Sequence, residues 1–125
     1  MGQPTNFYET VELMCEKDPR YKPDSYDFVL QALNSTQKKL SRAGHISGQE
    51  LLEGLRESAL KQFGPMAKTV LNYWGIHTTV DFGNIVFLMI EYKLLSRTEQ
   101  DSLKDFENVY DFDSAFKHTV TDIVI

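Results

Sequence analysis

Apolar residues recur at helical spacing near the start of the chain. Val11 and Met14 fall on one face of a possible helix, whereas three glutamates fall on the opposite face. This pattern predicts a first helix over Phe7–Lys17, with Thr5 or Asn6 as its N-cap.

Helix boundary signals divide the next stretch into two helices. The second helix is expected to begin near Pro23 and to end at Gly44, since glycine readily adopts the left-handed conformation of a C-cap. Ser47 and Glu50 match a capping box, in which each side chain accepts a backbone amide of the other residue. They predict the start of a third helix, which ends before Gly64.

The following residues predict a short helix and then a strongly apolar one. The short helix covers Pro65–Trp74 and stops at Gly75. Thr78 and Asp81 match a second capping box, and the helix that follows it to about Leu94 is apolar almost all round. We expect this fifth helix to be the central, most buried element.

The last part of the chain has a different pattern. Aromatic and β-branched residues such as Phe106 and Tyr110 favour one or two short strands or an ordered extended segment. The whole pattern predicts a mainly α domain with a small β element: five helices, a winged-helix-like core and a C-terminal extended or wing segment. We expect one domain over residues 1–125, with flexible ends at 1–5 and 118–125.

Composition and charge argue against a nucleic-acid or membrane partner. The 125 residues are 42% hydrophobic and 25% charged, which is typical of a globular protein, and the net charge is −5. The closest approach to a basic cluster is Lys38, Lys39 and Arg42, which lie near a predicted helix end where cations are favoured by the helix dipole. A chain this acidic repels phosphates unless its bases gather on one face.

The predicted fifth helix also argues against DNA recognition. In a helix-turn-helix protein the second helix enters the major groove and carries basic and polar side chains. Here the only charged residues between Thr79 and Tyr92 are Asp81 and Glu91, and both are acidic. A helix of this kind fits a core element or an interface better than a reader of bases.

A cytoplasmic location is expected from three features. The single cysteine, Cys15, cannot form an intramolecular disulfide and lies on an apolar helical face. The N-terminus lacks the basic and apolar regions of a signal peptide. The longest apolar run, Ile85–Ile90, is too short to span a bilayer.

No spacing in the chain indicates catalytic, cofactor or metal chemistry. The three histidines, His45, His77 and His118, form no zinc-type pair, and the isolated glycines form no phosphate-binding loop. We therefore predict no catalytic, cofactor-binding or metal-ligating residue and no cofactor.

Acidic and aromatic residues alternate late in the chain and form the best candidate for an interaction site. An edge of this kind could attract a basic partner by charge and anchor it by its rings, or the rings could simply pack inward. We call this candidate the acidic edge, and its residues are Asp105, Phe106, Glu107, Tyr110, Asp111 and Phe112.

The assembled motifs resemble a known family. The long stretch SGQELLEGLRESALKQFGPMAKTVLNYWGIHTTVDFGNIVFLMIEYKLLS, the following DSLKDFENVYDF and the earlier DPRY and SYDFV segments are similar to a family of small bacterial conserved hypothetical proteins. The likeness runs from about Phe7 to Phe116. It implies a bacterial cytosolic protein and supplies no catalytic residue.

The sequence leads to one function hypothesis and two alternatives. The first is a non-catalytic, cytosolic protein-interaction module that docks a protein partner or a second copy of itself. The first alternative is a small-ligand-binding protein or an enzyme, with a pocket that a sequence cannot show. The second alternative is a nucleic-acid binder of winged-helix type, against which the charge argues.

Overall fold

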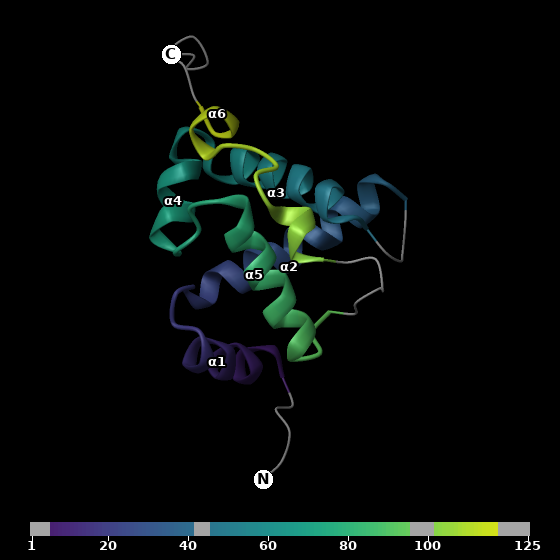
Figure 1. The fold of residues 1–125 in the computed structure, drawn as a ribbon, viewed down its shortest axis with the longest axis vertical. Helices are drawn as coiled ribbons and strands as arrows, with labels where there is room; N and C mark the ends of the chain where they lie inside the picture. The colour runs from purple at the N-terminus through teal and green to yellow at the C-terminus, as the bar shows by residue number, and fades with distance from the viewer. Residues whose placement is uncertain (1–5, 42–45, 96–101, 118–125) are drawn as a thin grey trace.

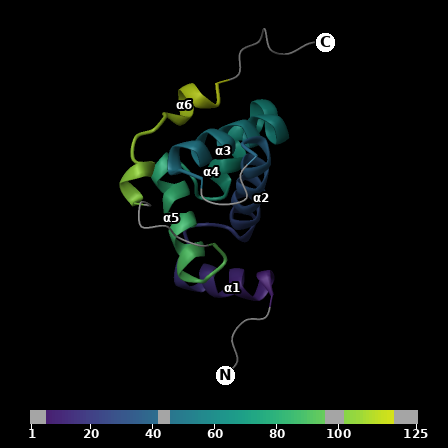
Figure 2. The ribbon, with the colours of Figure 1, turned by 90° about the vertical axis from the view of Figure 1, so that its right-hand side faces the viewer.

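The computed structural model describes residues 6–41, 46–95 and 102–117, which form a helical fold (Figure 1). Both views place α1 at one end of the molecule and α6 at the other, with α5 between them (Figures 1 and 2). The elements in chain order are α1 (Phe7–Lys17), α2 (Pro23–Lys39), α3 (Gly48–Phe63), the 3-10 turn η1 (Gly64–Met66), α4 (Ala67–Tyr73), α5 (Thr79–Glu91), the 3-10 turn η2 (Leu103–Phe106) and α6 (Phe112–Ala115).

The first helix has the bounds that the sequence predicts. Asn6 is its N-cap, and the side chain of Asn6 accepts a hydrogen bond from the amide of Glu9 at 2.8 Å. The buried face contains Val11 and Met14, as the apolar spacing indicates. The alternative cap, Thr5, and the expected flexible ends at 1–5 and 118–125 lie outside the described residues.

The second helix begins at Pro23 as predicted but ends at Lys39, earlier than the predicted stop. Ser41 adopts the left-handed conformation, with φ of 54°, that was expected of Gly44. The helical conformation is therefore interrupted before the glycine is reached, and Gly44 itself lies outside the described residues.

Helices α2 and α3 pack closely at one glycine. A methyl group built at Gly54 would lie 1.9 Å from the hydroxyl oxygen of Thr36. That hydroxyl donates to the carbonyl of Ala32 at 2.7 Å and is buried, so it cannot easily move aside. Glycine at this position allows the two helix axes to approach.

The capping signals after α2 are confirmed. The hydroxyl of Ser47 accepts the amide of Glu50 at 3.1 Å, and the carboxylate of Glu50 accepts the amide of Ser47 at 3.0 Å. Gly64 and Gly75 both have positive φ, 51° and 94°, and both follow the helices that they were expected to stop. The predicted fourth helix is divided into η1 and α4.

Helix α5 supplies much of the core, as its apolar sequence predicts. Phe82, Ile85 and Met89 are fully buried, and they belong to one cluster that includes residues from all the other α-helices. The other side of α5, with Phe87 and Leu88, is partly exposed. Among the described residues, no helix has the length and apolar character that a membrane span requires.

Residues 102–117, which we call the C-terminal strap, run over α5 and α3 (Figure 2). The predicted small β element and strand-like wing are wrong for this segment, because the described residues contain no strand. The strap instead consists of η2, a turn with Asn108 at φ of 50°, and α6. A strand needs a neighbouring strand to bond its amides, whereas the amide of Val109 bonds the side chain of Thr79 on α5.

Candidate functional site

The aromatic residues of the acidic edge point into the molecule. Phe106 and Phe112 are only 3% and 4% exposed. Tyr110 is half-buried, and its hydroxyl donates to the carbonyl of Leu52 on α3 at 2.8 Å. Of the two arrangements that the sequence left open, the structure has the one in which the rings pack inward.

Two glycines make room for Phe106. A methyl group built at Gly83 in α5 would lie 2.8 Å from Phe106, and one built at Gly48 at the start of α3 would lie 3.3 Å from its ring. The ring of Phe87 meets the ring of Phe106 edge to face, with centroids 6.1 Å apart. Phe106 therefore anchors the strap in a gap between α3 and α5 that these glycines leave open.

A buried hydroxyl on α5 ties the backbone of the strap to the same place. Thr79, the first residue of α5, is 1% exposed. Its hydroxyl donates to the carbonyl of Phe106 at 2.5 Å and accepts the amide of Val109 at 3.3 Å. Thr79 thus satisfies two backbone groups of the strap that would otherwise be left unpaired near the core.

Farther along the strap, Phe112 is the centre of a ring cluster. Its ring centroid lies 4.9 Å from that of Phe116, 5.8 Å from that of Phe82 and 6.1 Å from that of Tyr110. Burial raises the pKa of the Tyr110 phenol above its usual value, and the nearby charge of Glu53 adds to this effect. The rings hold the strap against the core.

The carboxylates of the acidic edge lie toward the solvent side of the strap. Asp105 is half-buried and caps η2, accepting the amide of Ser102 at 3.1 Å. Asp111 is exposed and caps α6, accepting the amide of Ser114 at 3.1 Å. Glu107 is exposed as well. Beyond the predicted edge, the exposed Asp113 pairs with Lys68 of α4.

A pocket of about 340 Å³ opens between the strap and the start of α5. One wall is formed by residues 77–80, at the start of α5, and the other by Asn108, Tyr110, Asp111 and Phe112 of the strap. The pocket therefore includes three residues of the predicted edge. Sequence reasoning missed its α5 wall, because nothing local in the sequence brings residues 77–80 next to residues 108–112.

The carboxylate of Asp81 compensates the partial positive charge at the N-terminus of α5, beside this pocket. One of its carboxylate oxygens accepts the amides of His77 at 2.8 Å and Thr78 at 3.1 Å, which are the amides just before α5. A helix N-terminus carries a partial positive charge, and a carboxylate at this position compensates it. The ring Nδ1 of His77 lies 3.0 Å from the side-chain oxygen of Asn72.

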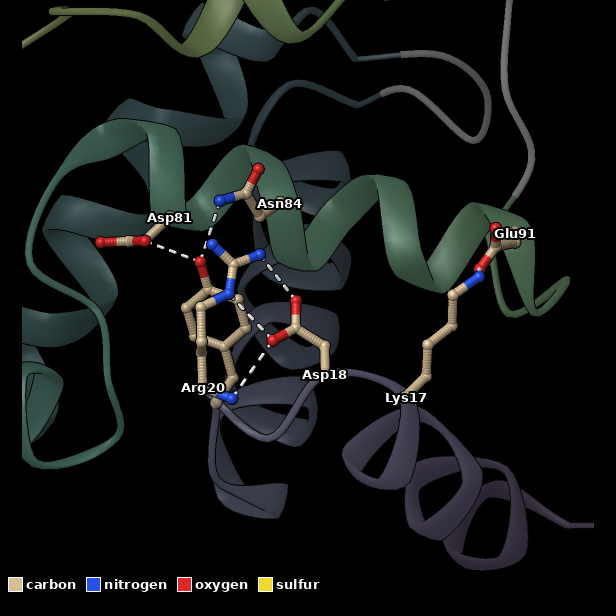
Figure 3. Close-up of polar contacts among 7 residues, drawn as sticks. Lys17, Asp18, Arg20, Asp81, Asn84 and Glu91 are labelled. Carbon is tan, nitrogen blue, oxygen red and sulfur yellow. Dashed lines mark hydrogen bonds and ion pairs between the residues drawn. The ribbon is translucent and has the colours of Figure 1, made fainter.

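The second oxygen of Asp81 belongs to a polar cluster between α5 and the loop that joins α1 to α2 (Figure 3). It accepts the hydroxyl of Tyr21 at 2.6 Å, and that hydroxyl in turn accepts the amide nitrogen of Asn84 at 2.9 Å. Asp18 and Arg20 form a bidentate ion pair in the same loop. The cluster joins the loop between α1 and α2 to α5, and this structural role accounts for its polar residues.

Cys15 contacts this loop, since its thiol lies 3.7 Å from the carbonyl oxygen of Tyr21. The thiol of Cys15 is half-buried, and desolvation, followed by the charge of Asp18, raises its pKa, so it remains protonated and poorly nucleophilic. The hydroxyl of Tyr26 is buried and has no hydrogen-bond partner among the described residues.

The sequence predicts that the histidines and other metal-ligating residues form no metal site. Across residues 6–41, 46–95 and 102–117, no group of three or more His, Cys, Asp or Glu side chains is arranged to hold a metal ion. His45 and His118 lie outside these ranges. Comparison with known proteins adds no candidate chemistry: no family model, curated protein or solved structure matches the chain. The resemblance to a bacterial family stays a prediction.

Proposed function

We propose that this protein is a non-catalytic, cytosolic protein-interaction module that binds a basic partner on the outer face of its C-terminal strap. The observation that carries the proposal is the two-sided construction of the strap. Phe106 and Phe112 fix it from the inside, while Glu107 and Asp111 are exposed on the outside. A surface whose backbone is held in place before binding loses less conformational entropy when a partner arrives.

The exposed side chains of the strap match the composition of a binding surface. Leu103 and Val109 are exposed apolar residues, 41% and 36% accessible, close in sequence to the two carboxylates. Apolar contact with a charged surround suits an interface in which charge steers the partner and apolar burial holds it. The net charge of −5 favours a basic partner over an acidic one.

We further infer that α3, α4 and α5 serve as a helix-turn-helix-like scaffold and that the strap occupies the position of a wing. Helix α5 would be the reading helix of a DNA-binding protein, but it packs its side chains in the core and its end charges, Asp81 and Glu91, are acidic. We therefore do not propose nucleic-acid binding.

A second candidate function is small-ligand binding, and the pocket beside α5 favours it. The pocket brings His77 and Asp111 to its walls, a pairing that sequence spacing did not reveal. Its volume lies near the lower end of the range for small-molecule sites, roughly 300–1,000 Å³. The same pocket would serve the enzyme alternative, in which a substrate binds between these two walls.

The test compares two variants that each remove two exposed carboxylates. Glu107→Gln with Asp111→Asn alters the strap, and asparagine still caps α6. Glu12→Gln with Glu16→Gln makes the same charge change on the exposed face of α1. Each protein is immobilised, and the proteins that it captures from a lysate are identified, after which the affinity of a purified partner is measured.

We expect the strap variant to lose a basic partner that the wild type and the α1 variant retain. Loss by roughly tenfold or more in affinity corresponds to about 1.4 kcal/mol, a reasonable effect for two charges at an interface. Equal capture by all three proteins would exclude the strap as the binding surface.

A further inference from the structure

We propose that the pocket between the start of α5 and the strap receives the guanidinium group of an arginine from the bound partner. This inference rests on the proposed function, and it specifies where the partner is held and by which side chain. The charge of the pocket, its aromatic lining and its size favour a guanidinium group.

The charge of the pocket favours a cation. The start of α5 alone would attract an anion, but the carboxylate of Asp81 already accepts the amides of His77 and Thr78 there. The opposite wall includes Asp111, an exposed residue with a carboxylate side chain. With the helix end compensated and a second carboxylate on a residue of the opposite wall, the pocket favours a cation over an anion.

The start of α6 holds this second carboxylate in a fixed position. Asp111 caps α6, since its Oδ2 accepts the amide of Ser114 at 3.1 Å and lies 3.4 Å from the hydroxyl of the same residue. A carboxylate that is fixed before binding loses little side-chain entropy when it meets a guanidinium, with which it can form paired hydrogen bonds.

A ring in the strap wall distinguishes arginine from lysine. Tyr110 lines the pocket and is only partly buried, and its hydroxyl is bonded to the carbonyl of Leu52, so the ring is fixed. Guanidinium groups are planar and weakly hydrated, and they stack on aromatic faces, whereas an ammonium group is compact and strongly hydrated. The amide and hydroxyl groups of Asn108 and Thr78 offer further acceptors at the walls.

The volume of the pocket suits one side chain. About 340 Å³ is small for a drug-sized molecule but sufficient for the end of a long side chain and its hydration. The neighbouring Glu107, on the solvent side of the strap, would then meet other basic residues of the same partner.

The test uses three acetylated and amidated pentapeptides of the form Gly-Gly-X-Gly-Gly, in which X is arginine, lysine or citrulline. Citrulline has almost the shape of arginine without its charge. Each peptide is titrated into isotopically labelled protein, and the amide shifts of the whole chain are followed by NMR. We expect the arginine peptide to shift the amides of residues 77–80 and 108–112 and to bind roughly tenfold more tightly than either other peptide.

Asp111→Asn tests the same contact from the protein side. This variant keeps an acceptor for the cap of α6 but removes the charge, and it should lower affinity for the arginine peptide about tenfold while leaving that for the citrulline peptide unchanged. Asp27→Asn, at an exposed carboxylate on α2 that bonds Gln31, is the matched control and should change neither affinity.

The outcomes separate this inference from the proposed function. Equal binding of arginine and lysine peptides, abolished by the Glu107→Gln and Asp111→Asn variant, would overturn the guanidinium pocket but retain the acidic strap as a binding surface. Equal binding of arginine and citrulline would likewise overturn it. No selective shifts with any peptide, together with unchanged partner capture by the strap variant, would overturn both proposals.

Discussion

Helix α1 and the C-terminal strap are both fastened to α5, but by different chemistry. The α1 side buries Val11 and Met14 in the core, but its described side-chain ties to α5 are polar, from Tyr21 to Asp81 and from Lys17 to Glu91 (Figure 3). The strap is joined by buried rings, chiefly Phe106. Polar ties can be exchanged for water, whereas a buried ring leaves a cavity when it is lost. The buried rings therefore hold the backbone of the strap in a fixed position, so that its exposed side chains form a rigid outer surface.

The largest expected effect comes from Phe106→Ala. Removing a buried ring that fills a gap between two helices should lower the free energy of unfolding by about 3–5 kcal/mol. Urea denaturation followed by circular dichroism measures this change. Val109→Ala, on the exposed side of the same strap, should remain within about 0.5 kcal/mol of wild type. Similar losses in the two variants would contradict the idea that the strap is held from the inside.

A smaller effect is expected where the α1 side meets α5. Tyr21→Phe removes a hydroxyl that donates to the carboxylate of Asp81 and accepts from Asn84. A hydrogen bond to a charged group contributes about 1.5–3 kcal/mol, so the urea midpoint should fall by a corresponding amount. Tyr8→Phe, at an exposed tyrosine of α1, serves as the control and should leave the midpoint unchanged. A Tyr21 variant as stable as the control would show that water replaces this tie at no cost.

Alkaline pH should weaken both attachments gradually. Burial raises the pKa of Tyr21 and Tyr110, and the hydrogen bond to Asp81 raises that of Tyr21 further. Because the folded state holds these protons more tightly than the unfolded chain, their contribution is complete below about pH 10 and is lost as the pH rises beyond it. Urea midpoints measured from about pH 8 to pH 11 should therefore fall, and less steeply for Tyr21→Phe. Parallel curves for the variant and wild type would argue against a role for Tyr21 ionisation.

The smallest effect is expected for the ion pair between α1 and α5. Lys17 Nζ lies 2.5 Å from a carboxylate oxygen of Glu91, but both side chains are about half exposed. Exposed pairs of this kind are weakened by solvent and salt. Lys17→Met should leave the urea midpoint unchanged within error at ordinary ionic strength. A clear loss of stability would show that the packing of α1 against α5 depends on this ion pair. The attachments of α1 and of the strap would then differ less in strength than we expect.

Local signals in the sequence predicted the parts of the fold that depend on neighbouring residues. The bounds of α1 and the capping box of Ser47 and Glu50 follow from contacts within one helical turn, and both are correct. The strap depends on distant residues. Phe106 fits against Gly48 and Gly83, which are far from it in the sequence. The alternation of aromatic and polar residues in this segment is the same whether the segment pairs as a strand or packs as a strap.

The sequence predicted only one wall of the candidate site, because the other wall also comes from distant residues. The acidic residues of the strap are adjacent in sequence, but the opposite wall of the pocket comes from residues 77–80. One signal could have been used: Gly83 lies in the middle of an apolar helix, where glycine costs about 1 kcal/mol relative to alanine. A glycine at such a position points to the close approach of another segment.

The hydrogen bond from the Val109 amide to Thr79 has a practical consequence. The donor belongs to a residue on the surface, yet the acceptor is a hydroxyl closed off from water. Solvent can reach this one amide hydrogen freely only when the strap lifts from α5. Its rate of exchange with deuterium therefore measures how often the strap opens while the helices stay folded, and a partner bound across the strap and α5 should slow that rate more than it slows exchange in α1.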